Sequence, residues 1–212
     1  MTTYTWVGGG GSLDDPSNWS VGDVNPPPPP LPVPNDTAIF GSPVGTLIGS
    51  LDAEDVDFQS PTFVLQCQIT AGDLTLESGK LILLAGTTIN TATAEFIGAS
   101  GDAGVEQYGG SNTLSDLVEN VSAGSYLLTS GTLTIVGDGL EFVGAGEGDF
   151  SVSGGTVSIT TGATGSNNSA GPVIVGDSGS GVFNQTNGQV TFGGNLIVGN
   201  GATGSGLVLL NG

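Results

Sequence analysis

Residues Gly181-Val-Phe-Asn-Gln-Thr-Asn-Gly188-Gln-Val-Thr-Phe192 decide the fold class, because their pattern recurs along the chain. The pattern is a glycine, an apolar residue two places later, a second glycine seven places after the first, and then alternating apolar residues. Earlier copies begin at Gly72, Gly124 and Gly148, and a further copy begins at Gly206. The spacing of these first glycines fits a period of about 24 residues with one coil skipped or degraded and one insertion, and a period of this size is typical of a repeat protein.

Alternating apolar residues in each copy predict strands that face a core on one side. The apolar residues lie two apart with Thr or Ser between them, as in Leu133 and Ile135, Val157 and Ile159, and Val190 and Phe192. We therefore expect these apolar residues to point inward and the hydroxyl residues between them to point outward.

A second pattern predicts further inward residues. Glu95-Phe-Ile-Gly98 and Glu141-Phe-Val-Gly144 are separated by close to two periods. Because a glutamate is seldom buried, the phenylalanine after each glutamate is expected to point into the core. By equivalence the same is expected of the isoleucines of later copies, so the inward set is Phe96, Phe142, Ile174 and Ile197.

Together these patterns predict an all-β chain folded as a right-handed parallel β-helix. A coil of about 23 to 25 residues would hold about three strands, each ending in a glycine turn. Residues 45–212 would then form about seven rungs. The polar run Thr160–Gly171 is expected to be a surface loop inserted between two of them.

Residues 1–44 have a different composition and are expected to form an N-terminal cap with a proline-rich spacer. Both tryptophans, Trp6 and Trp19, lie here with Tyr4 and Phe40. The end of a stack of strands leaves apolar side chains and unpaired backbone groups that need a cover. The tract Pro26–Pro30 predicts a stiff polyproline II segment.

The charge of the chain argues against several functions. It has 20 Asp and Glu against one cation, Lys80, and a formal net charge of -19. Such a chain repels nucleic acid and anionic membranes, and it has no apolar run long enough to insert into a membrane. Without His or Arg it lacks the side chains that most catalytic sites use. We therefore expect no enzyme, and neither a catalytic nor a cofactor-binding residue.

Calcium is the one cofactor that the acidic residues suggest. Asp52-Ala-Glu-Asp-Val-Asp57 is the densest acidic cluster, and calcium prefers such oxygen ligands. Strand alternation is expected to divide these side chains between the two faces of a strand, which favours a solvated acidic surface over a calcium site. The lone Cys67 is expected to be a buried apolar residue.

Two carboxylate pairs are candidates for polysaccharide cleavage, which needs two acidic side chains. They are Asp138 with Glu141, and Glu147 with Asp149. No platform of aromatic residues that could stack on a sugar is evident in the sequence around either pair, so a polysaccharide-binding or polysaccharide-cleaving β-helix is kept only as an alternative.

The repeats resemble those of bacterial surface and secreted proteins. The stretch Gly193-Gly-Asn-Leu-Ile-Val-Gly-Asn-Gly-Ala202 after the first quoted copy is similar to autotransporter passenger β-helices and related β-strand-repeat proteins. The start, with Trp6-Val-Gly-Gly-Gly-Gly-Ser12 and Asn35-Asp-Thr-Ala-Ile-Phe40, is similar to the leader that often precedes such repeats. The resemblance implies an extracellular or cell-surface location, reached by a route not visible in the sequence.

The expected function is a non-enzymatic structural or adhesive β-solenoid of a bacterial surface or matrix, with glycans or proteins of a host or matrix as partners. The alternative is a filament subunit that stacks on itself head to tail. Gly206-Leu-Val-Leu-Leu-Asn-Gly212 favours this alternative, because it carries four consecutive apolar residues.

Overall fold

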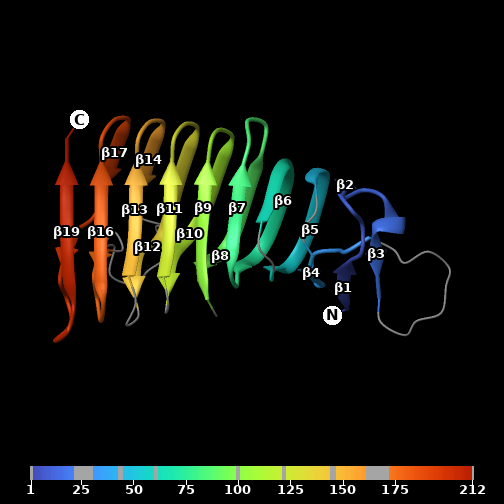
Figure 1. The fold of residues 1–212 in the computed structure, drawn as a ribbon, viewed down its shortest axis with the longest axis horizontal. Coiled ribbons are helices and arrows are strands. Elements are labelled where there is room, and N and C mark those ends of the chain that lie inside the picture. Colours follow the sequence, from blue (N-terminus) through green and yellow to red (C-terminus); the bar gives the residue numbers. More distant parts are fainter. Residues whose placement is uncertain are drawn as a thin grey trace.

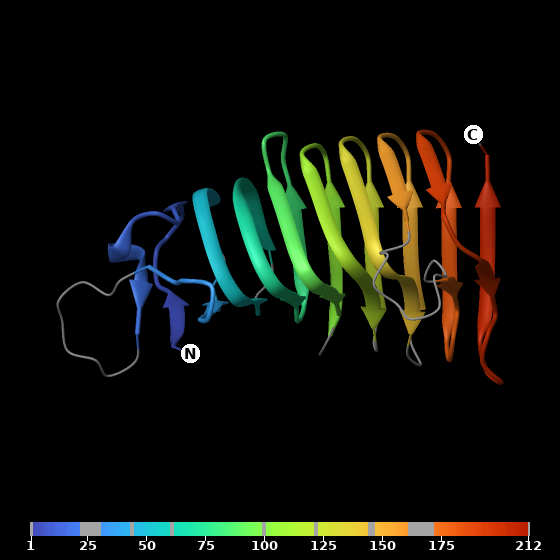
Figure 2. The same ribbon diagram turned by 180° about the vertical axis from the view of Figure 1, so that it is seen from behind.

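The chain forms an elongated stack of coils. The structure, a computed structural model, describes residues 2–21, 31–42, 45–59, 62–98, 101–120, 123–143, 147–160 and 172–211. Figure 1 shows the coils following one another in chain order along the long axis, with the N- and C-terminal ends of the chain at opposite ends of the stack. Figure 2 shows the same order from behind.

Strands make up nearly all the regular structure of the described residues. The N-terminal end holds β1 (Thr3–Trp6), β2 (Gly11–Ser12), the short 3₁₀ helix η1 (Pro16–Asn18) and β3 (Trp19–Ser20). The first coils contain β4 (Thr37–Phe40), β5 (Thr46–Phe58), β6 (Thr62–Leu76), β7 (Gly79–Leu83) and β8 (Thr88–Ile97). The middle coils contain β9 (Asp102–Gln107), β10 (Ser111–Asn120), β11 (Ala123–Leu128), β12 (Thr132–Val143), β13 (Glu147–Val152) and β14 (Thr156–Ile159). The last coils contain β15 (Val173–Val175), β16 (Ser180–Gln185), β17 (Gln189–Phe192), β18 (Leu196–Val198) and β19 (Ser205–Leu210). None of the described segments is a helix with the length and apolar character needed to cross a membrane.

One parallel ladder runs through the stack and confirms the predicted parallel β-helix. Its register joins equivalent residues of β5, β6, β7, β9, β11, β13, β16 and β19, namely Thr46, Val64, Ile82, Glu106, Leu127, Ser151, Asn184 and Leu209. The first two steps of this row, which end at Ile82, are shorter than all the later ones. The longest step, from Ser151 to Asn184, contains the polar run that was expected to be an insertion. Seven steps agree with the expected number of rungs.

The core is formed by the inward rows of this ladder and of its neighbours. The four central residues predicted to point inward are buried, namely Leu133, Ile135, Val157 and Ile159. Their partners in the last coil, Val190 and Phe192, are half-buried against the same core. Cys67 is buried as expected, and burial raises the pKa of its thiol to about 12.

The copy that begins at Gly72 was assigned to the wrong register. The ladder pairs Gly79, not Gly72, with Ala103, and Ala103 in turn aligns with Gly124. The chain from Gly79 to Gly124 is therefore two steps that meet at Ala103, and the coil between them has an alanine in place of the first glycine of the pattern. The error arose because the first coils are shorter than the later ones, so a constant period does not reach them.

The prediction for the Glu-Phe pattern was also wrong. Glu95 aligns with Leu74 and Leu117 on the inward side and is fully buried, whereas Phe96 is half-buried on the outward side. In the later coils Val173 takes the inward position, and Ile174 is buried but lies in the outward row with Glu141. Ile197, its partner in the last coil, lies in the same outward row and is half-buried, and the side chain of Phe142 lies outside the described part of the chain.

Aromatic side chains close the N-terminal end of the stack. β1 pairs with β4 in parallel and with β3 in antiparallel fashion. Trp6 and Trp19 are buried with their ring centroids 5.1 Å apart, and both pack against Phe40. The Trp19 indole donates a hydrogen bond to the Leu13 carbonyl at 2.9 Å. The tract Pro26–Pro30 lies outside the described residues, as does most of the predicted loop Thr160–Gly171.

Apolar side chains remain exposed at the other end. In β18, Leu196 and Val198 are more than a third exposed, and in β19 the same holds for Leu207, Leu209 and Leu210. Among the described strands, β19 pairs with β16 alone. The last coil therefore presents an apolar edge, in contrast to the aromatic cluster at the first.

Candidate functional site

A shallow groove crosses the outer face of the wall that β7, β9, β11 and β13 form. Two adjoining depressions of about 370 and about 230 Å³ share Lys80, Gly104, Ser125 and Asp149. The ladder places these four residues in one outward row, one from each strand. The groove therefore runs across successive coils, along the stack.

Small residues in the middle of the row make the groove. Gly104 has no side chain, and a Cβ atom there would lie 2.6 Å from the Ser125 Oγ atom. Longer side chains flank this gap, with Lys80 and Glu106 at one side and Asp149 at the other. The described strands thus leave a hollow over Gly104 and Ser125 that a ligand could occupy.

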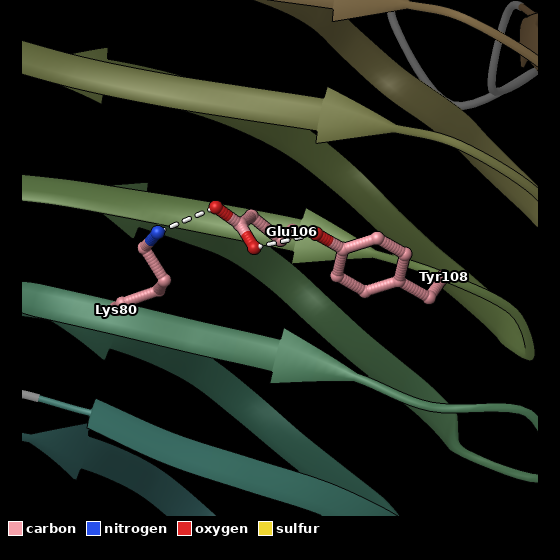
Figure 3. Close-up of polar contacts among 3 residues, drawn as sticks. All are labelled: Lys80, Glu106 and Tyr108. Atoms are coloured by element: carbon pink, nitrogen blue, oxygen red, sulfur yellow. Dashed lines mark hydrogen bonds and ion pairs between the residues drawn. The ribbon is translucent and has the colours of Figure 1, made fainter.

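Lys80, Glu106 and Tyr108 form a chain of polar contacts at one side of the groove (Figure 3). Lys80 Nζ lies 2.5 Å from Glu106 Oε1, and the Tyr108 hydroxyl donates to Glu106 Oε2 at 2.9 Å. The hydrogen bond from Lys80 lowers the pKa of the Glu106 carboxyl. Bonding to Glu106 in turn raises the pKa of Lys80 and of Tyr108. At neutral pH the lysine and the glutamate are therefore charged and the tyrosine is neutral, and the contacts fix where each side chain points.

The groove suits a neutral ligand better than an acidic one. Lys80, the only cation in the sequence, is paired with Glu106, while Asp102, Glu147 and Asp149 line the adjoining depression. Carboxylate and hydroxyl oxygens form hydrogen bonds with the hydroxyl groups of sugars. Tyr108, which is 45 % exposed and bonded to Glu106, adds an aromatic ring next to that end of the groove.

No protein-family model, curated protein or solved structure matches this chain. What the groove can do follows from the chemistry of its own residues.

Glu147 and Asp149, one of the two carboxylate pairs, lie in this groove. Both are exposed and project from the outward side of β13, two residues apart. Asp149 Oδ1 accepts a hydrogen bond from the Ser151 hydroxyl at 2.9 Å. Glycosidases place their two carboxyl groups on either side of the scissile bond, whereas these two stand side by side on one strand. This arrangement fits hydrogen bonding to a ligand better than it fits hydrolysis.

The other pair is not brought together in the described part of the chain. Asp138 lies in β12, but its side chain is outside the described part. Glu141 is half-buried on the outward side of β12, where the ladder aligns it with Val118 and Ile174.

The four acidic side chains of β5 all project from its outward side, so the expected division between two faces was wrong. Asp52 and Glu54 are not buried, and neither are Asp55 and Asp57. The inward residues here are Ala53 and Val56, three apart, because the strand bends between them and its alternation shifts by one. Hydrogen bonds already engage Asp55, from Thr37 Oγ1, and Asp57, from Gln59 Nε2. Within the described residues no group of three or more His, Cys, Asp or Glu side chains could hold a metal ion.

Apart from Glu147 and Asp149, the groove residues were not identified from the sequence. Lys80 is the only one that its residue type distinguishes, as the single cation of the chain. That signal does not indicate a partner, because Glu106 lies 26 residues away and is brought beside Lys80 by the length of one coil.

Proposed function

We propose that this chain is a non-enzymatic structural or adhesive element of a bacterial cell surface or extracellular matrix, in which the stacked coils serve as a rod. The unbroken ladder from Thr46 to Leu209 carries this proposal. A stack in which each coil pairs with the next along its length holds its two ends at a fixed separation. The location of the rod rests on the resemblance of its repeats to those of surface proteins.

The adhesive role would use the outer groove. Its row of small residues, with hydroxyl and carboxylate oxygens beside it, fits a neutral glycan that lies along the stack. The negative charge of the chain disfavours acidic glycans.

Binding to insoluble neutral polysaccharides tests this role. Ser125→Trp fills the groove and should abolish co-sedimentation with the polysaccharide. Ser180→Trp is the matched control, because Ser180 is also exposed on an outward row but lies in β16, outside the groove lining. It should bind as the unaltered chain does.

The same samples test the enzymatic alternative. We expect no release of reducing sugar. Release that Asp149→Asn abolishes would contradict the proposal and would establish a glycoside hydrolase instead.

Self-association is the second candidate function, and the last coil favours it. Five apolar residues of β18 and β19 are more than a third exposed there. Residues 172–211 contain only one charged residue, Asp177, so the repulsion that separates other parts of two chains is weak at this end. A second copy could pair with β19 and cover its apolar side chains. Head-to-tail contact would extend into a filament, whereas contact between two such ends would stop at a dimer.

A further inference from the structure

A chain of polar side chains crosses the interior between the walls of the β-helix. Glu95 and Asn112 lie on β8 and β10, and Gln107 and Tyr126 lie on β9 and β11. All four are fully buried. Their neighbours in the inward rows are apolar, since Asn112 lies between Ile89 and Leu133 and Glu95 lies between Leu74 and Leu117. A polar group is costly in such a place unless it is hydrogen-bonded.

Every side-chain donor among these four residues has an acceptor. Asn112 Nδ2 donates to Glu95 Oε2 at 2.7 Å and to the Tyr126 hydroxyl at 3.2 Å. The Tyr126 hydroxyl donates to Gln107 Oε1 at 2.6 Å. Gln107 Nε2 donates to the carbonyl oxygens of Gly110 and Thr132 at 3.3 and 3.0 Å. These bonds fix which end of each amide is the nitrogen.

Two acceptor oxygens among these four residues have no donor. Glu95 Oε1 and Asn112 Oδ1 are both buried and without a hydrogen-bond partner among the described residues. They are the remaining oxygens of the two planar groups that the 2.7 Å hydrogen bond already joins. One proton on Glu95 Oε1 would turn that atom into a donor and supply the missing partner of Asn112 Oδ1.

No positive charge is available to stabilise an ionised Glu95. Lys80, the single cation in the sequence, is bound to Glu106 on the outer face. On the adjacent strands, Asp73 of β6 and Asp116 of β10 immediately precede Leu74 and Leu117, the row neighbours of Glu95, and are half-buried. Their charges would oppose a further negative charge on Glu95. Tyr126 is the other titratable side chain in the polar chain.

We propose that Glu95 is protonated in the folded protein and forms an acid–amide pair with Asn112, a latch between two coils that ionisation releases. Burial is the main cause that raises the pKa of the Glu95 carboxyl, to about 7, and the hydrogen bond from Asn112 partly opposes it. The latch is therefore closed in mildly acidic solution and opens as the pH rises through neutrality.

The sign of the effect on stability follows from the difference between the two states. In the unfolded chain Glu95 loses its proton near its ordinary pKa of 4.5, whereas the folded protein keeps it up to about pH 7. Between these values the unfolded state is favoured more with each rise in pH, so stability falls until about pH 7 and then stays low. The unfolding constant should rise roughly 100-fold from this residue alone.

Glu95→Gln tests the latch, because a glutamine makes the same two hydrogen bonds to Asn112 at every pH. Urea unfolding of both proteins should give similar unfolding constants at pH 5. At pH 8 the constant of the unaltered chain should exceed that of the variant roughly 100-fold. The other carboxylates are the same in both proteins, so their effect on the pH dependence cancels when the two unfolding constants are compared. Glu54→Gln is the control, since Glu54 is on the outer face. The ratio of its unfolding constant to that of the unaltered chain should not change between pH 6 and pH 9.

A direct measurement covers the case in which Glu95→Gln does not fold. Infrared spectra of the unaltered chain at pH 6 should show the carbonyl band of one protonated carboxyl group, which disappears as the pH is raised through about 7. The proposal would be overturned if the unfolding constants of the unaltered chain and of Glu95→Gln changed in parallel with pH, or if that band were absent at pH 6.

Discussion

Gly131 forms the turn between β11 and β12 and shows why glycine marks the repeats. Its φ is 92°, a conformation that other residues rarely adopt, and Gly155 and Gly188 repeat it in the next coils with φ of 77° and 80°. A Cβ atom on Gly131 would also lie 2.5 Å from the Gly110 carbonyl oxygen of the coil below. Both the turn and the close stacking of turns therefore require a residue without a side chain.

Gly131→Ala should lower the free energy of unfolding by about 1–3 kcal/mol, because the alanine is strained and also meets a backbone that cannot move freely. Urea unfolding followed by circular dichroism measures the change. Gly41→Ala is the matched control, since Gly41 has open space around it and no positive φ. It should be neutral or slightly stabilising. Equal stabilities of the two variants would contradict this account of the turns.

Inward apolar residues were predictable in the middle coils, whereas the buried glutamate was not. Leu133 and Val157 are found where simple alternation puts them. Glu95 was misplaced because Glu141 carries the same letters, Glu-Phe, while the ladder joins Glu95 through Leu117 to the residue before Glu141. The register of β10 shifts just before Asp116 against both of its neighbouring strands, which accounts for such offsets. On each side of a local bulge the apolar residues still alternate regularly, so the sequence does not show that the register has shifted.

Individual strands were predicted more accurately than the groove that four of them form together. Turn glycines and alternation predicted the strands of the coils that begin at Gly124, Gly148 and Gly181. The groove depends on which residues of four strands come to lie in one row, and that depends on coils whose lengths are not equal. An error of one residue in any coil exchanges its inward and outward residues. The Lys80–Glu106 contact could not be found at that level of accuracy.

β19 is the element on which self-association depends. We expect light scattering to show a mass that grows with concentration, because Leu207 and its neighbours are covered when two copies meet. Leu207→Lys should keep the chain monomeric, since it places a charge on that edge at an exposed position. Ile48→Lys is the control, because Ile48 is similarly exposed but lies on β5 in the first coils, and it should associate as the unaltered chain does.

A monomer at every concentration would rule out self-association and leave the adhesive rod. Association that stops at a dimer would indicate contact between two C-terminal coils, and continued growth would indicate head-to-tail stacking. Association that persists in Leu207→Lys would place the contact elsewhere.

At the scale of the whole molecule, charge and apolar surface are unevenly distributed along the rod. The formal net charge of -19 keeps the sides of two rods apart. The last coils carry only Asp177 among charged residues, and they hold half of the exposed large apolar residues of the described chain. The rod is thus suited to contacts at one end and repelled along its sides, which favours either a spacer or an end-joined assembly.

The distance between two spin labels on one outward row tests most directly that a single ladder runs through the molecule. Cysteines at Thr46 and Ser151, in a chain with Cys67→Ala, lie five steps apart on that row. With roughly 4.8 Å per step, we predict a narrow distribution centred at about 24 Å. A broad distribution, or a maximum far from that distance in a chain that remains folded, would contradict the stacked register on which the groove, the latch and the rod all depend.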